Sequence, residues 1–126
     1  MPRKPLVILV VEDETLLLQA IVKKLQMSGV EPVSAVSGRQ AIDYLNALPK
    51  LPDGIWLDYY LKDMDGLEFM EELKKNPAWA NIPVMVVTNS ASPEKAHRML
   101  ALGAKGYMVK SDYRLEKVVE EMKKIV

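Results

Sequence analysis

The chain has 126 residues, 49% of them hydrophobic, so it is long and apolar enough to form one globular domain with a buried core. Lys plus Arg and Asp plus Glu number 17 each, and this balance gives no electrostatic reason to expect nucleic acid or an anionic membrane as a partner. The lack of cysteine excludes disulfides and thiolate sites, and the single histidine excludes a histidine metal cluster. The apolar run near the N-terminus has only about six residues before acids intervene, shorter than the core of a signal peptide. No run approaches the length of a membrane span, so we expect a cytoplasmic protein.

The hydrophobic pattern alternates between short apolar runs and longer segments with apolar residues at helical spacing. The short runs are rich in branched side chains, which is typical of strands buried on both faces. In chain order the pattern predicts a strand at 6–11, a helix at 12–29, a strand at 30–36, a helix at 37–48, a strand at 53–58, a helix at 65–76, a strand at 82–88, a helix at 92–103, a strand at 105–110 and a helix at 113–126.

Residues with special backbone roles mark the ends of these elements. Ser37, Asp65 and Ser92 stand where a side chain that caps a helix N-terminus is expected. Gly29 predicts the end of the first helix, because glycine readily adopts the left-handed conformation that ends a helix. Pro32 lacks a backbone donor and therefore predicts that the second strand lies at an edge of its sheet.

Strand followed by helix, repeated five times, predicts an α/β domain: a doubly wound, five-stranded parallel sheet with helices on both faces. We expect residues 1–126 to form this single domain, because no linker, repeat or low-complexity segment divides the chain. In such sheets ligands bind outside the carboxyl ends of the strands. Those ends carry Glu12, Asp13, Asp58, Thr88 and Lys110.

Three carboxylates at one edge of a sheet repel one another. At about 4 Å and an effective dielectric near 20, each like pair costs on the order of 4 kcal/mol. A divalent cation offsets this repulsion, and a ligand set made only of oxygen atoms favours Mg²⁺ over Zn²⁺. We interpret Asp13 and Asp58 as direct metal ligands, Glu12 as an outer-shell partner, and the backbone carbonyl of Tyr60 as a further oxygen ligand.

Lys110 brings a cation to the same edge, and a cation beside a metal and a carboxylate forms a receptor for a phosphoryl group. Asp58 is then the nucleophile that forms an acyl phosphate, and Thr88 donates to a phosphoryl oxygen. Taken singly, each residue also fits an ordinary role at a strand end; their conjunction at four strand ends favours the functional interpretation. We interpret Asp63 and Asp65 as loop polarity and helix capping.

Four stretches resemble the receiver domain of bacterial two-component response regulators, in the order that this family shows. They are VVEDE at 10–14, DYYLKDMDG at 58–66, VVTNSA at 86–91 and GYMVK at 106–110. The resemblance spans essentially the whole chain. It implies the flavodoxin-like (βα)5 fold of CheY-like proteins, with strand order 2-1-3-4-5 and no output domain within residues 1–126.

The resemblance also implies a function. Asp58 is expected to accept phosphate, with Mg²⁺, from a sensor histidine kinase or a histidine phosphotransfer protein, while Thr88 and Lys110 hold the phosphoryl group and Tyr107 follows Thr88 inward as a switch. The protein is therefore expected to be a signalling switch rather than an enzyme. It would catalyse only its own phosphorylation and its slow autodephosphorylation. Phosphorylation is expected to reshape the face made by helix 92–103, the strand through Tyr107 and the final helix. This face would then bind a downstream protein, a separate output domain or a second copy of the chain.

Some positions near the site depart from the family pattern. Lys62 stands where the family often has proline, Asn89 where a small residue is usual, and Ser111 where proline usually follows the lysine on a cis bond. Tyr60 lies two residues past Asp58 and is predicted to shield the acyl phosphate from water, which would slow its hydrolysis.

Three other functions fit parts of the pattern. A phosphatase of the haloacid dehalogenase class also uses an aspartate nucleophile and Mg²⁺, but it requires a D-x-D-x-T/V arrangement where this chain has EDETL. A flavodoxin-like flavin module requires a phosphate-binding loop after the first strand, and Glu12, Asp13 and Glu14 in that loop would repel phosphate. The third alternative is a receiver-like interaction module that works without phosphate because Asn89 and Ser111 disable the site.

Overall fold

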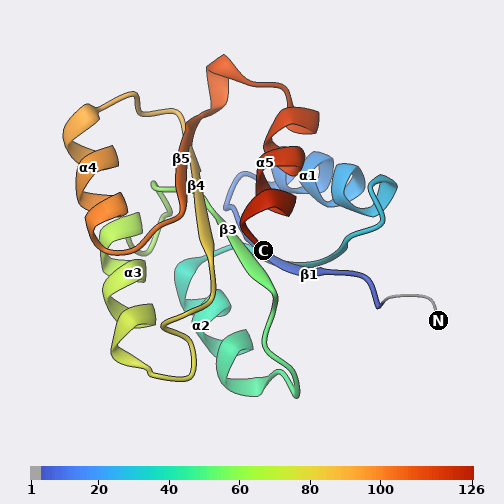
Figure 1. Ribbon diagram of the computed structural model, residues 1–126, viewed down its shortest axis with the longest axis horizontal. Helices are drawn as coiled ribbons and strands as arrows, with labels where there is room; N and C mark the ends of the chain where they lie inside the picture. Colours follow the sequence, from blue (N-terminus) through green and yellow to red (C-terminus); the bar gives the residue numbers. More distant parts are fainter. Residues whose placement is uncertain (1–3) are drawn as a thin grey trace.

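The computed structural model describes residues 4–126, which form one parallel sheet between two layers of helices (Figure 1). The strands are β1 (Val7–Val11), β2 (Glu31–Ala35), β3 (Gly54–Leu57), β4 (Val84–Thr88) and β5 (Gly106–Val109). Their order across the sheet is β2-β1-β3-β4-β5, which confirms the predicted order. Pro32 lies on the edge strand β2, as its missing backbone donor requires.

Five helices connect and follow the strands, and their predicted places are confirmed. They are α1 (Thr15–Met27), α2 (Gly38–Ala47), α3 (Gly66–Lys75), α4 (Pro93–Ala101) and α5 (Leu115–Ile125). Helices α1 and α5 cover one face of the sheet, and α2, α3 and α4 cover the other (Figure 1). None of the helices in residues 4–126 combines the length and the apolar character that crossing a membrane requires.

The strands are apolar throughout because both faces of the sheet are buried. Successive side chains of a strand point to opposite faces. In β1, Ile8 and Val10 therefore pack in the core beneath α1 and α5, while Leu9 and Val11 pack in the core beneath α2, α3 and α4. This double burial holds each strand between two layers of helices, so packing on both faces fixes the point at which each strand ends.

The helix ends follow the chemistry read from the sequence. The Ser37 hydroxyl accepts from the backbone of the third helical residue at 3.0 Å, and Asp65 does the same for α3 at 2.9 Å. Gly29 has a φ of +76°, in the left-handed region that a side chain would disfavour. The clearest differences from the prediction are that α1 begins only at Thr15 and α5 only at Leu115, and that a short 3₁₀ turn at Lys110–Asp112 follows β5.

The loop after β3 is anchored to helix α2 by Asp63 and Met64. The Asp63 carboxylate accepts from the backbone N–H groups of Gly38 at 3.0 Å and Arg39 at 2.8 Å, so it caps α2 from a distant part of the chain. Met64 lies against Gly38, where a Cβ atom would come within 2.4 Å of the methionine sulfur. These contacts hold the loop although Lys62 stands in place of proline.

Replacing Asp63 with alanine should destabilise the protein by about 1 kcal/mol, the usual cost of losing a helix cap. Partial burial alone would raise the pKa of Asp63, but the hydrogen bonds from Arg39 and Gly38 outweigh it and hold that pKa below its usual range. Urea denaturation measures the change, with exposed Lys62→Ala in the same loop as the control. Equal midpoints for the two variants would show that the cap contributes nothing.

Candidate functional site

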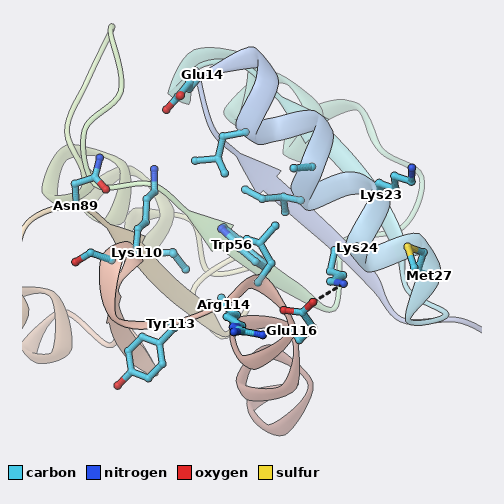
Figure 2. Close-up of a pocket in the computed structure, with 17 residues that line it drawn as sticks. Glu14, Lys23, Lys24, Met27, Trp56, Asn89, Lys110, Tyr113, Arg114 and Glu116 are labelled. Atoms are coloured by element: carbon cyan, nitrogen blue, oxygen red, sulfur yellow. Dashed lines mark ion pairs between the residues drawn. The ribbon is translucent and has the colours of Figure 1, made fainter.

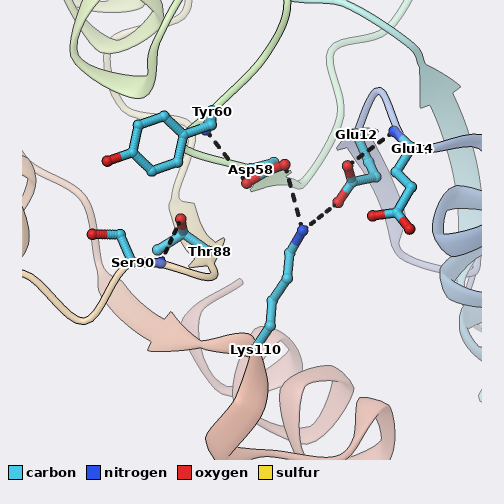
Figure 3. A network of polar contacts seen from close by, with 7 residues as sticks. All are labelled: Glu12, Glu14, Asp58, Tyr60, Thr88, Ser90 and Lys110. Carbon is cyan, nitrogen blue, oxygen red and sulfur yellow. Dashed lines mark hydrogen bonds and ion pairs between the residues drawn. The ribbon is translucent and has the colours of Figure 1, made fainter.

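The carboxyl ends of four strands bring polar side chains to one edge of the sheet (Figure 3). The backbone ladder continues past the strands at this edge: Glu12 N–H donates to Ala35 at 3.0 Å, and Asp58 N–H donates to Val11 at 3.0 Å. Glu12 and Asp58 therefore leave the sheet at positions fixed by backbone pairing. Because Glu12 still pairs with the edge of the sheet, helix α1 starts later than predicted.

Lys110 reaches across this edge and contacts two of the acids. Its Nζ atom lies 2.7 Å from Glu12 Oε1 and 3.4 Å from Asp58 Oδ2 (Figure 3). Glu12 is 1% exposed and Asp58 is 7% exposed, so both carboxylates are largely removed from water. The peptide bond between Lys110 and Ser111 is trans, and Lys110 still faces the acids without the proline of the family pattern.

Burial and charge shift the titration of the central pair. Burial, followed by the negative charge of Glu12, raises the pKa of Asp58 to about 7, and the Lys110 cation offsets part of this. Burial works to lower the pKa of Lys110, but its hydrogen bond to Glu12 and the charge of Asp58 raise that pKa above the usual value. The pocket thus holds more negative charge than one lysine neutralises.

The acids fit a magnesium ion. One carboxylate oxygen from each of Glu12, Asp13 and Asp58 lies within 4.8 Å of the others. Octahedral Mg²⁺ with ligands at about 2.1 Å places opposite oxygens about 4.2 Å apart, so small side-chain movements suffice. Both oxygens of Glu12 accept hydrogen bonds, from Lys110 at 2.7 Å and from Glu14 N–H at 3.1 Å. Both oxygens of Asp58 accept at the longer distance of 3.4 Å, so Asp58 is held less firmly than Glu12 and can turn more easily toward an ion.

Thr88 and Tyr107 both contact the loop between β4 and α4. Thr88 is fully buried at the end of β4, and its hydroxyl accepts from the Ser90 N–H at 3.3 Å. The Tyr107 hydroxyl donates to the Ser90 carbonyl at 3.0 Å. Ser90, which no sequence pattern singled out, is therefore the residue through which Thr88 and Tyr107 are connected.

Tyr60 lies beside Asp58, as its position two residues later requires. Its backbone N–H donates to Asp58 Oδ1 at 3.4 Å, and its side chain is 47% exposed (Figure 3). The role of its carbonyl oxygen as a metal ligand stays a prediction. Asn89 lines a neighbouring cavity together with Lys110.

That cavity, of about 760 Å³, lies between α1 and the start of α5 (Figure 2). Lys110, Asn89 and Glu14 lie at one end, and the 2.6 Å ion pair between Lys24 and Glu116 spans the other. The wall between the two ends is largely apolar and includes Leu17, Ile21, Trp56 and Val118. An apolar groove thus opens beside the acidic site.

Comparison with known proteins gives this arrangement a family. Residues 8–122 match the family model of the response regulator receiver domain. The phosphate regulon transcriptional regulatory protein PhoB of Escherichia coli is 35% identical over 103 residues, which are 82% of this chain and 44% of PhoB. The rice two-component response regulator ORR8 is 31% identical over 103 residues, covering 82% of this chain and 84% of ORR8.

Solved structures of similar proteins support the same family. The chemotaxis protein CheY4 of Vibrio cholerae is 26% identical with a TM-score of 0.87, covering 97% of this chain and 99% of CheY4. The phosphorylated cyanobacterial phytochrome response regulator RcpA is 29% identical with a TM-score of 0.81, covering 96% and 91%. This chain spans less than half the length of PhoB but nearly all of CheY4. It therefore belongs to the receiver domains of two-component response regulators, a family of phosphorylation-dependent signalling switches.

Proposed function

We propose that Asp58 accepts a phosphoryl group from the phosphohistidine of a sensor histidine kinase or a histidine phosphotransfer protein. An Asp58 oxygen attacks phosphorus, the phosphorus–nitrogen bond breaks, and its electron pair returns to the imidazole. The observation that carries this proposal is the placement of the Lys110 ammonium between the buried Glu12 and Asp58 carboxylates. A cation held there is available to a phosphoryl oxygen at the moment Asp58 gives up its own charge.

Each neighbouring residue has a defined part in this reaction. Asp13 and Asp58 would hold Mg²⁺, with Glu12 in the outer shell, because their carboxylate oxygens cluster within 4.8 Å. When bound, Mg²⁺ neutralises charge on the transferred phosphoryl group. The Thr88 hydroxyl, at the end of β4, donates to a phosphoryl oxygen once it turns toward Asp58. Positioning and charge neutralisation supply most of the catalysis in phosphoryl transfer.

The output follows from the contacts of Thr88. Phosphorylation adds about 1.5 to 2 negative charges at one point, which attracts the Thr88 hydroxyl away from the Ser90 N–H. Ser90 also accepts from Tyr107, so the loop before α4 and the ring of Tyr107 shift together. The changed face, made by α4, β5 and α5, would bind a downstream protein, a separate output domain or a second copy. Such a shift is worth about 1–3 kcal/mol.

The groove between α1 and α5 suits the donor protein. It is apolar, it opens beside Lys110, and amphipathic helices bind in grooves of this kind. A donor helix in the groove would bring its phosphohistidine beside Lys110, which lines the groove and pairs with Asp58. Autodephosphorylation is the one further reaction proposed for the domain, with water as the acceptor.

The experiment that tests this function is phosphoryl labelling. Incubation with acetyl phosphate and Mg²⁺ should add one phosphoryl group to the intact protein by mass spectrometry, and Asp58→Asn should add none. Labelling should stop when Mg²⁺ is chelated. A wild-type protein that takes up no phosphate would favour the phosphate-independent interaction module instead. Labelling of Asp58→Asn would show that another residue is the acceptor.

Replacing Tyr60 with serine should accelerate hydrolysis of the acyl phosphate by about tenfold, which corresponds to about 1.4 kcal/mol of barrier. Tyr60 is half-exposed and its backbone N–H donates to Asp58, so we expect its ring to limit the access of water to the acyl phosphate, and serine removes that cover. Loss of label after removal of the donor gives the rate. Tyr113→Ser, a similarly exposed tyrosine away from Asp58, is the control. An unchanged or slower rate in Tyr60→Ser would refute the shielding role.

A further inference from the structure

Tyr60 lies beside Asp58 and is held by contacts with the loop that carries Asp58 and with helix α4. Its backbone donates to Asp58 Oδ1 at 3.4 Å, and its ring meets the buried ring of Tyr59 edge-on at a centroid distance of 4.9 Å. From helix α4, the ammonium group of Lys95 donates a hydrogen bond to the Tyr60 hydroxyl and lies 5.4 Å from the centre of the Tyr59 ring. Lys95 thus contacts the outer end of a side chain whose own backbone N–H donates to the acceptor.

The position of Lys95 is itself connected to Thr88. The Lys95 N–H donates to the hydroxyl of Ser92, the Ser92 N–H to the hydroxyl of Ser90, and the Ser90 N–H to the hydroxyl of Thr88, each at 3.3 Å. A continuous series of contacts therefore runs from Thr88 through the start of α4 to Tyr60. All three are near the long end of the hydrogen-bond range, so a small movement of Thr88 is enough to alter them.

The contact between Lys95 and Tyr60 has a defined polarity. An ammonium group only donates, so the Tyr60 oxygen accepts and its own proton stays available to water or to a phosphoryl oxygen. Within residues 4–126 the ion pairs do not include Lys95, so tyrosine rather than a carboxylate is its partner. Removing the ammonium group therefore acts on Tyr60 and on the neighbouring Tyr59 ring, and it breaks none of these ion pairs.

We propose that Lys95 is a positioning residue that holds Tyr60 over the acyl phosphate and so sets its rate of hydrolysis, an inference that rests on the proposed function of Asp58. Because Lys95 belongs to the first turn of α4, the lifetime of the phosphoryl group is controlled from that helix. A partner that changes the position of α4 would therefore move Lys95 and change the lifetime as well.

The test is a double-mutant cycle on hydrolysis of the acyl phosphate formed with acetyl phosphate. Lys95→Met keeps an unbranched stem and removes the cation, and it should accelerate hydrolysis about three- to tenfold, with Lys95→Arg restoring most of the lifetime. In a Tyr60→Phe background, which lacks the accepting hydroxyl, Lys95→Met should have no further effect. Lys62→Met, in the exposed acceptor loop, removes the same charge without the contact and should leave the rate unchanged.

The outcomes separate this inference from the proposed function. An unchanged rate in Lys95→Met, or an equal acceleration in the wild-type and Tyr60→Phe backgrounds, would overturn the positioning role while Asp58 remained the acceptor. If Asp58 takes up no phosphate, the proposed function and the control of hydrolysis both fail, and the aromatic resonances of Tyr60 decide whether Lys95 positions the ring. Resonances that move in Lys95→Met but not in Lys62→Met support it, and resonances that stay in place overturn it.

Discussion

Replacing Lys110 with methionine is expected to destabilise the metal-free protein by about 3 kcal/mol at pH 8, because breaking a buried ion pair leaves an uncompensated charge. Glu12 is 1% exposed, and within residues 4–126 its ion pair is with Lys110. Asp58 loses the same cation at 3.4 Å. The free energy of unfolding from urea titrations in the presence of a chelator measures the effect.

Two further variants identify the cause. Adding Glu12→Gln to Lys110→Met removes the stranded charge and should recover a large part of the loss. Lys117→Met is the matched surface control, because Lys117 is 48% exposed and its pairs with Glu120 and Glu121 are screened by water. If Lys110→Met and Lys117→Met unfold at the same urea concentration, Lys110 does not neutralise the site.

Lys110→Met should also abolish rapid phosphorylation by acetyl phosphate, since the phosphoryl group loses its cation. This readout is independent of folding when it is measured at a temperature where the variant remains native. If a folded Lys110→Met variant were labelled as fast as the wild type, Lys110 would take no part in the reaction.

The metal-free protein should lose stability as the pH rises from about 4 to about 7, and Asp58→Asn should not. The pKa of Asp58 is raised from 3.8 to about 7 in the folded protein, first by burial and then by the charge of Glu12. Between these two values the folded state binds more protons than the unfolded state, so each increase in pH favours unfolding. The slope attributable to this group is on the order of 1 kcal/mol per pH unit.

The sign of the effect is opposite to that of a carboxylate in a simple ion pair. Below about pH 4 the carboxyl group is protonated in both states, and above about pH 7 it is ionised in both, so stability should level off at each end. At pH 8, Asp58→Asn should therefore be more stable than the wild type without metal. Thermal or urea unfolding across this range, with chelator present, measures both curves.

Magnesium provides the matching control. A cation that binds the folded state stabilises it in proportion to RT ln(1 + [Mg²⁺]/Kd), and its two charges should favour ionised Asp58. Added Mg²⁺ should therefore raise the stability of the wild type at pH 8 and have a weaker effect on Asp58→Asn. Parallel pH curves for the two proteins, with no response to Mg²⁺ in either, would show that the acids do not form a shared site.

Local sequence patterns were sufficient to predict the order of the elements and the residues that leave the sheet at its carboxyl edge. Uninterrupted apolar runs indicate strands buried on two faces, and apolar residues at helical spacing between caps such as Ser37 and Asp65 indicate helices. Because parallel strands share one carboxyl edge, knowing where each strand ends was enough to bring Glu12, Asp58 and Lys110 together.

Which side chains meet across that edge became clear only from the folded chain. Lys110 pairs with Glu12, 98 residues away, and Lys95 meets Tyr60, 35 residues away. Asp63, which in the sequence is one more acid in a loop, caps helix α2. Such partners depend on how loops from different strands fold over one another, within hydrogen-bond distances of about 3 Å, and no periodicity along the chain specifies positions that finely.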